Sequence, residues 1–166
     1  RSVKMIVFDK TGTLTVGRPR LTDIIAVDGS ELDLLRLAAS AEYASEHPIA
    51  RAVVRAAEEK GITLSQSEAF EAIKGKGIRA RLPEGQVLVG SVRLLTENGV
   101  AAEAVEAEVS RLESLARTTM VVALNGKALG VLAVADTLKE HAAEALAVLR
   151  RMGIRTAMLT GDNRRT

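Results

Sequence analysis

The fold is decided by two adjacent stretches near the start of the chain, VKMIVF at residues 3–8 and DKTGTLT at residues 9–15. The first is rich in β-forming apolar residues and predicts a strand. The second begins with a carboxylate, and at the carboxyl end of a parallel strand such a group faces the crevice in which phosphate ligands bind. Asp9 can then attack a phosphoryl group, and Lys10 with the hydroxyl and amide groups that follow can neutralise its oxygens. The alternative, an aspartate that opens an ordinary polar turn, is disfavoured because so specific a seven-residue string is very rare by chance.

A second apolar strand is predicted at residues 153–159, near the other end of the chain. Thr160, Gly161 and Asp162 follow it, and this triplet alone is a common turn sequence. If the first and last strands are parallel neighbours, residues 1–15 and 133–166 form one discontinuous α/β layer, and residues 16–132 are an inserted domain. Because the chain stops soon after the second motif, we expect it to be part of a larger protein.

The insertion has the pattern of an α+β domain. Apolar residues at helical spacing predict helices at 31–44, 48–60 and 101–115, with a further helix at 139–152 after the insertion. Short β-rich runs between glycine-containing turns predict antiparallel strands at 69–73, 78–82 and 87–90. Asn125-Gly126 predicts a hairpin that joins strands 120–124 and 128–135.

The composition excludes several functions. The 166 residues include 23 Lys+Arg and 21 Asp+Glu, so the net charge of +2 is too small for a basic nucleic-acid-binding arm. Aromatic residues make up only 2%, which disfavours recognition of single-stranded nucleic acid by base stacking. There is no cysteine, and this rules out disulfides, thiolate catalysis and cysteine-based metal sites. No apolar run approaches the roughly 20 residues that a membrane span needs.

The string at residues 9–15 resembles the phosphorylation motif of the P-type ATPases, ion pumps of the haloacid-dehalogenase superfamily, and the resemblance covers essentially the whole chain. It implies that Asp9 is phosphorylated from ATP with Lys10 beside it, and that Thr11 contacts the γ-phosphate and offers its carbonyl to Mg²⁺. Thr160-Gly161-Asp162 matches the second phosphate-site motif of this family, and Asp136-Thr137-Leu138-Lys139 matches a third segment at a hinge before the last helix. Residues 1–15 and 133–166 would then be an incomplete, Rossmann-like phosphorylation domain, and residues 16–132 a nucleotide-binding domain built on an antiparallel sheet.

His47 precedes Pro48 at the start of the second predicted helix and has two interpretations. A histidine there most often caps the helix or lies at the surface. Its position also resembles the heavy-metal-transporting class of these pumps, in which the histidine and a glutamate five residues earlier, here Glu42, line the adenine site.

The same resemblance assigns three glycines to the nucleotide pocket, namely Gly75, Gly77 and Gly90. Glycine lets the backbone approach phosphate or ribose closely, so the role is physically reasonable. By itself, however, Gly75-Lys76-Gly77 is more often a plain β-turn. The pocket is predicted because all of these features occur in the order of the family.

The resemblance also sets expectations for cofactors and partners. ATP and Mg²⁺ are the cofactors, and the actuator and transmembrane parts of the same pump are the partners of a monomeric, cytoplasmic domain of a membrane protein. Copper(I) export is favoured over zinc, cadmium or cobalt transport by the similarity of residues 41–50 and 87–95, although this chain is not expected to bind the transported metal. In the family a further Mg²⁺ ligand lies beyond the position of Thr166. Asp9 and Thr11 alone would be a poor Mg²⁺ site, so we expect ATP binding with little or no turnover.

Two other functions are weighed against this one. A soluble phosphatase of the same superfamily usually carries a second aspartate two residues after the nucleophile, as acid and base for the leaving group and water. Thr11 occupies that position here, and an acyl phosphate would persist instead of hydrolysing. A non-enzymatic nucleotide-binding module is the remaining alternative for a chain without the whole site.

Overall fold

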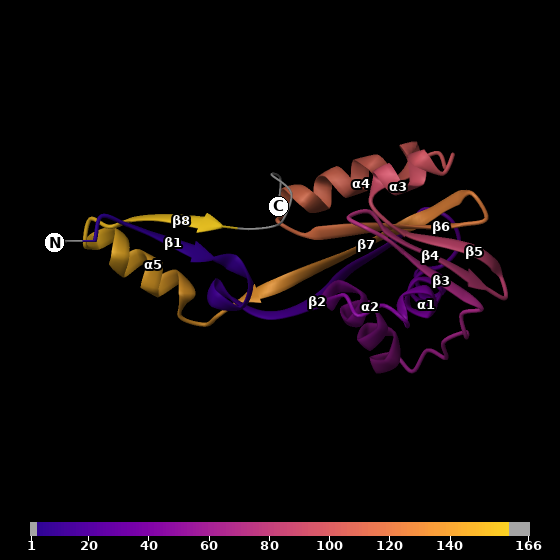
Figure 1. Ribbon diagram of the computed structural model, residues 1–166, viewed down its shortest axis with the longest axis horizontal. Helices are drawn as coiled ribbons and strands as arrows, with labels where there is room; N and C mark the ends of the chain where they lie inside the picture. The colour runs from indigo at the N-terminus through magenta and orange to yellow at the C-terminus, as the bar shows by residue number, and fades with distance from the viewer. Residues whose placement is uncertain (1–2, 160–166) are drawn as a thin grey trace. The chain divides into compact units, whose positions relative to one another are not determined.

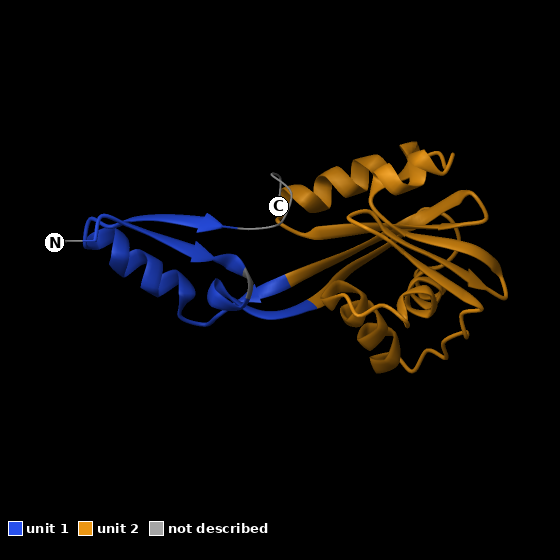
Figure 2. Cartoon of the chain, in the orientation of Figure 1, with its two compact units in different colours: residues 1–19, 136–164 blue, residues 20–135, 165–166 orange. Residues whose placement is uncertain are grey.

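The computed structural model describes residues 3–159, and these form two compact units (Figures 1 and 2). The smaller unit contains the chain up to Pro19 and again from Asp136, and the larger unit runs from Arg20 to Ala135. From the sequence we expect the boundaries slightly earlier, after residues 15 and 132. Thr160, Gly161 and Asp162 lie outside the described residues.

The smaller unit is built on two parallel strands. Strand β1 (Met5–Asp9) pairs with β8 (Arg155–Leu159), and Asp9 lies opposite Leu159 at the carboxyl end of both strands. Helix α5 (Ala142–Arg151) precedes β8 and begins three residues later than the periodicity predicts. The prediction that the first and last strands are parallel neighbours is therefore confirmed.

The larger unit is built on a six-stranded sheet with the strand order β2-β7-β6-β5-β4-β3. The pairs from β7 to β3 are antiparallel. The turn between β6 and β7 has positive φ at both Asn125 and Gly126, as the Asn-Gly hairpin predicts. The strands are β2 (Thr15–Ala26), β3 (Ala69–Ile73), β4 (Gly77–Leu82), β5 (Gly85–Gly90), β6 (Thr118–Leu124) and β7 (Lys127–Leu138).

Helices cover both faces of this sheet (Figure 1). Helices α1 (Glu31–Glu42) and α2 (Pro48–Glu59) pack with one set of alternate strand residues, including Ile78 and Val89. Helices α3 (Val92–Glu97) and α4 (Glu103–Ser114) pack with the intervening set, including Leu88 and Val121. Because successive side chains of a strand point to opposite faces, the sheet contributes to two aliphatic cores at once.

Two elements are absent from the sequence prediction. Strand β2 contains Gly17 and Pro19, which weaken its strand signal, but a proline is tolerated because β2 is an edge strand. Helix α3 has only six residues, too few for a clear helical period, and begins where the Ser91 hydroxyl accepts a hydrogen bond from Leu94 N at 3.3 Å. Among the described residues, no helix combines the length and hydropathy of a membrane span.

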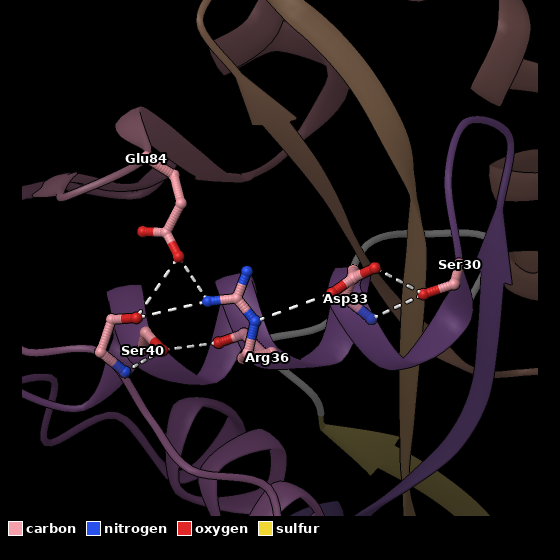
Figure 3. A network of polar contacts seen from close by, with 6 residues as sticks. Ser30, Asp33, Arg36, Ser40 and Glu84 are labelled. Atoms are coloured by element: carbon pink, nitrogen blue, oxygen red, sulfur yellow. Dashed lines mark hydrogen bonds and ion pairs between the residues drawn. The ribbon is translucent and has the colours of Figure 1, made fainter.

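A polar network holds α1 against neighbouring segments of the larger unit (Figure 3). The Arg36 guanidinium contacts Glu84 at 2.5 Å, in the turn between β4 and β5, and holds the pKa of that carboxyl below its usual value. Ser40, fully buried in α1, donates to the Arg36 carbonyl at 2.7 Å and accepts from Ser65 N at 3.0 Å. These bonds fix the helix that ends at Glu42, a residue with a predicted function.

Candidate functional site

Asp9 lies where the sequence predicts, as the last residue of β1 and beside a parallel neighbour. Its side chain is exposed. The chain then turns tightly through a five-residue π-helical segment, Lys10–Leu14, in which Gly12 has a φ of +77°. Only glycine adopts that conformation without strain, which accounts for the glycine in the middle of the motif. The arrangement presents a carboxylate at the mouth of a turn rich in backbone amides.

The structure assigns two more residues to this turn. The Lys139 ammonium donates to the Gly12 carbonyl at 2.6 Å, and Lys139 N donates to Leu14 O at 2.9 Å. Thr15 lies directly after the turn and is buried, with 1% of its surface exposed. Thr15 belongs to the quoted motif, but nothing in the sequence indicates that its hydroxyl bonds to Asp136, because that residue lies 121 positions away.

A divalent cation is implied by the motif, and the described residues supply part of a site for one. Asp9 offers an exposed carboxylate beside the backbone carbonyls of the turn, and such oxygens are the ligands that Mg²⁺ prefers. No cluster of three or more histidine and acidic side chains occurs within residues 3–159. Asp9 therefore fits as one ligand of an ion that would also need ligands from phosphate and water.

Glu42 is the last residue of α1 and is buried, with 7% of its surface exposed. Desolvation by burial raises the pKa of its carboxyl from 4.5 to about 7, although a hydrogen bond from Ser45 acts in the opposite direction. Near neutral pH the carboxyl therefore populates both its ionised form, which only accepts hydrogen bonds, and its protonated form, which also donates one. A carboxyl whose pKa is raised by burial marks a candidate functional group.

His47 caps α2, and its Nδ1 accepts a hydrogen bond from Ile49 N at 3.3 Å. Pro48 follows at the first helical position, where its missing N–H costs nothing. Because Nδ1 is the acceptor, the neutral ring carries its proton on Nε2. The side chain is exposed, so capping uses one nitrogen and leaves the Nε2–H of the neutral ring as a donor. The capping and binding interpretations are therefore compatible.

The three predicted glycines lie at one end of the β3-β4-β5 meander. Gly75 is in the β3–β4 turn with a φ of +71°, and Gly77 lies opposite Gly90 in the β4–β5 pairing. A Cβ on Gly77 would overlap the Val89 carbonyl oxygen, and one on Gly90 would overlap the Lys76 carbonyl oxygen. Close backbone approach within the protein itself thus requires glycine at positions 77 and 90, whereas at position 75 only the positive φ favours it.

Glu42 and His47 are carried by helices that pack on the face of β4 and β5 formed by Ile78 and Val89. Two hollows with volumes of about 150 and 300 Å³ occur elsewhere in the larger unit. Arg81 and Gln86 line both of them, and neither is lined by a residue that the sequence assigns to nucleotide. No sequence motif marks these hollows, so they are a competing location for a ligand.

The chain matches the family model of the haloacid dehalogenase-like hydrolases over residues 3–166. It is 50% identical over 165 residues to a probable copper-exporting P-type ATPase of Archaeoglobus fulgidus. That match covers 99% of this chain and 20% of the relative, so the chain spans about a fifth of the length of that curated protein.

Solved structures show the same resemblance. A zinc-transporting PIB-type ATPase in its E2.Pi state superimposes with a TM-score of 0.76 at 39% identity, covering 98% of this chain and 26% of that one. The catalytic domain of a CPx-ATPase, solved to show conformational changes upon nucleotide binding, superimposes with a TM-score of 0.68 at 27% identity. This match covers 97% of this chain and 54% of that domain. The chain therefore resembles the catalytic part of metal-transporting P-type ATPases over nearly all of its length.

Proposed function

The chain belongs to the haloacid dehalogenase-like hydrolase family, and we propose that it is the ATP-binding and phosphoryl-accepting part of a copper-exporting P-type ATPase. In this proposal the larger unit is the nucleotide-binding domain and the smaller unit is part of the phosphorylation domain. The actuator and transmembrane parts of the same pump are its partners, and the chain lies on the cytoplasmic side of the membrane.

The observation that supports phosphoryl transfer most directly is the position of Asp9 at the carboxyl end of β1, followed by the glycine-containing turn. One carboxylate oxygen attacks the γ-phosphorus of ATP, the bond to the bridging oxygen breaks, and ADP leaves with that oxygen. The product is an acyl phosphate on Asp9. Lys10 and the backbone amides of the turn balance the charge on the transferred group. When bound, Mg²⁺ would neutralise further charge on the phosphoryl oxygens, and Asp9 and the Thr11 carbonyl would hold it.

The residues proposed to bind the nucleotide are Glu42, His47, Gly75, Gly77 and Gly90. The Glu42 carboxyl can both accept and donate a hydrogen bond, and the Nε2–H of His47 can donate one. Both groups can therefore bond to the edge of adenine. At Gly77 and Gly90 the backbone of the ladder and the Leu94 side chain occupy the place of a Cβ. The place of a Cβ on Gly75 is open, so ribose or phosphate can approach the backbone there. Thr160, Gly161 and Asp162 complete the proposed phosphate site from outside the described residues.

Copper is proposed as the transported ion on the strength of sequence similarity. The copper-exporting relative is 50% identical to this chain, whereas the zinc-transporting structure is 39% identical. The fold itself does not distinguish the two ions, because the zinc transporter also superimposes well. Zinc, cadmium or cobalt transport is therefore the alternative within the same class of pump.

The experiment that tests the nucleotide site is a calorimetric titration of ATP into the purified chain with Mg²⁺ present. The wild type should bind ATP at a single site. His47→Gln should weaken binding about tenfold, because the flexible amide keeps a donor but loses the ring that the bond to Ile49 N holds in place. Gln86→Ala is the matched control, because Gln86 lines both hollows and is not among the proposed nucleotide residues.

Each result of this titration has a distinct meaning. Weakening in His47→Gln with no change in Gln86→Ala supports the proposed pocket. The reverse pattern would move the nucleotide to the hollows beside Arg81. If the wild type binds no ATP, the chain is not an ATP-binding unit by itself and the proposal fails in this form.

A further inference from the structure

Thr15 connects the turn after Asp9 to a residue far along the chain. Its hydroxyl lies 2.6 Å from the Asp136 carboxylate, across 121 positions of sequence, and both residues belong to the smaller unit. The same hydroxyl oxygen accepts a hydrogen bond from Gly12 N at 3.2 Å. The Lys10 carbonyl is also 3.2 Å away, but the shorter, charge-assisted bond to the carboxylate takes the hydroxyl proton. Thr15 therefore links Asp136 to the middle of the turn.

Asp136 has further partners, and all of them follow the turn. Its carboxylate accepts hydrogen bonds from Gly17 N at 3.1 Å and from Arg18 N at 3.1 Å, in addition to the Thr15 hydroxyl. A carboxylate that accepts three such bonds is strongly fixed in orientation. Because these donors all lie within residues 15–18, Asp136 holds the segment that leaves the turn.

The peptide groups on both sides of Gly12 are fixed by this arrangement. The Gly12 amide donates to Thr15, and the Gly12 carbonyl accepts from the Lys139 ammonium at 2.6 Å. Gly12 has a positive φ, and a Cβ placed on Gly17 would lie 3.4 Å from Gly12 Cα, so the two glycines also pack closely. Residues 136 and 139 thus determine in which direction the peptide groups of the turn point.

We propose that Asp136 is a positioning residue that acts through Thr15 to set the conformation of the turn that follows Asp9. Asp136 does not touch the reacting atoms. Its effect on phosphoryl transfer rests on the function proposed above, because a turn with preorganised amides stabilises charge on the transferred group better than a mobile one. Its effect on the turn itself does not depend on that function.

The first test measures amide exchange with water at Gly12 by NMR in the wild type and three variants. Thr15→Val removes the acceptor of the Gly12 amide, and Asp136→Asn weakens the bonds that hold that acceptor in place, so each should speed exchange at Gly12 about tenfold. Thr15→Ser keeps the hydroxyl and should restore exchange to the wild-type rate. Exchange at Gly12 that is unchanged in Asp136→Asn would overturn the proposal.

Two controls separate positioning from a general loss of structure. Thr22→Val removes a hydroxyl from the same strand, one that donates to the Asp23 carboxylate at 2.7 Å and lies outside the turn, so Gly12 should be unaffected. The amide of Arg155, which donates to Lys4 O at 3.1 Å, reports on the β1–β8 pairing. If Asp136→Asn speeds exchange equally at Arg155 and Gly12, the role of Asp136 is only structural and the proposal is wrong.

The second test compares ATP binding with phosphoryl transfer in the same variants, using ATP labelled at the γ-phosphate. Asp136→Asn should keep the wild-type ATP affinity and reduce labelling of Asp9 at least about tenfold, and Thr15→Ser should restore the labelling. Unchanged labelling in Asp136→Asn would contradict a role in transfer. If the wild type is not labelled, the phosphoryl-accepting part of the proposed function fails for the isolated chain and its ATP-binding part stands. The exchange rates still decide whether Asp136 positions the turn.

Discussion

Gly77 and Gly90 lie opposite each other in the β4–β5 ladder, with no room for a side chain at either position. A Cβ on Gly77 would lie 2.6 Å from Gly90 Cα, and a Cβ on Gly90 would lie 2.8 Å from Gly77 Cα. The backbone geometry therefore requires glycine whether or not a nucleotide binds. The backbone of the ladder and the Leu94 side chain fill this side of both glycines, so a nucleotide would have to approach them from another side.

Replacing Gly77 by alanine should lower the free energy of unfolding by about 2–4 kcal/mol, because overpacking adds to the strain of a φ of +142°. Gly75→Ala is the matched control: its φ is +71°, but nothing lies within 4 Å of the added Cβ, so the loss should be only about 1–2 kcal/mol. Urea unfolding of both variants measures the difference. Equal losses of unfolding free energy would mean that the close approach of Gly77 to Gly90 is not the reason why glycine is required at position 77.

Glu42 should make the protein less stable as pH rises from about 4.5 to about 7. Its carboxyl has a pKa of about 7 in the folded protein and 4.5 as its ordinary value, so within this window the folded state holds a proton that the unfolded state has released. The penalty is absent at lower pH and reaches its full size above pH 7, up to about 3 kcal/mol for the whole shift. Glu42→Gln removes it. In urea unfolding, the variant should therefore gain stability relative to wild type as pH rises from about 5 to about 8. If the unfolding free energies of the two proteins change in parallel with pH, the pKa of Glu42 is not raised.

Ser40 should be important for the segment that follows α2. Ser40→Ala leaves the Ser65 amide without its acceptor, and we expect a loss of about 1–2 kcal/mol in unfolding free energy with faster amide exchange at Ser65. Ser67→Ala removes an exposed hydroxyl that donates to the Ala69 carbonyl and should cost less than about 0.5 kcal/mol. Similar losses in both variants would show that the burial of Ser40 adds nothing to the contribution of its hydrogen bonds to stability.

Asp9→Asn should abolish phosphorylation and preserve ATP binding. The substitution removes a negative charge at the position where the γ-phosphate is proposed to lie, so the affinity for ATP should stay the same or increase a few-fold at low salt. Calorimetry and labelling from γ-labelled ATP measure the two effects separately. A large loss of ATP affinity would indicate that Asp9 binds the nucleotide and does not accept its phosphoryl group.

Much of this fold can be predicted from local patterns. The positions of α1, α2 and the β3–β5 meander follow from apolar periodicity and glycine turns, and Asn125-Gly126 indicates the β6–β7 hairpin. Strand β2 is the element that the sequence prediction most clearly misses, because Gly17 and Pro19 make its sequence resemble that of a loop. Its strand conformation comes from pairing at the edge of a sheet whose other strands are distant in sequence.

The candidate site likewise has a part that the sequence predicts and a part that it does not. Asp9 can be found from its motif and the strand before it, since both are local. The contact between Thr15 and Asp136 cannot be found, because it depends on how two segments 121 residues apart come together. The burial that raises the pKa of Glu42 is likewise a property of packing around α1 and leaves no trace in the neighbouring sequence.

The most direct test of the account is an NMR titration of the labelled chain with ATP, in which the shift of every backbone amide is followed. If the nucleotide binds as proposed, the largest shifts should occur at and beside Glu42, His47, Gly75, Gly77 and Gly90. Shifts concentrated instead around Arg81, Asn98 and Asn125, which line the larger hollow, would contradict the proposed nucleotide site.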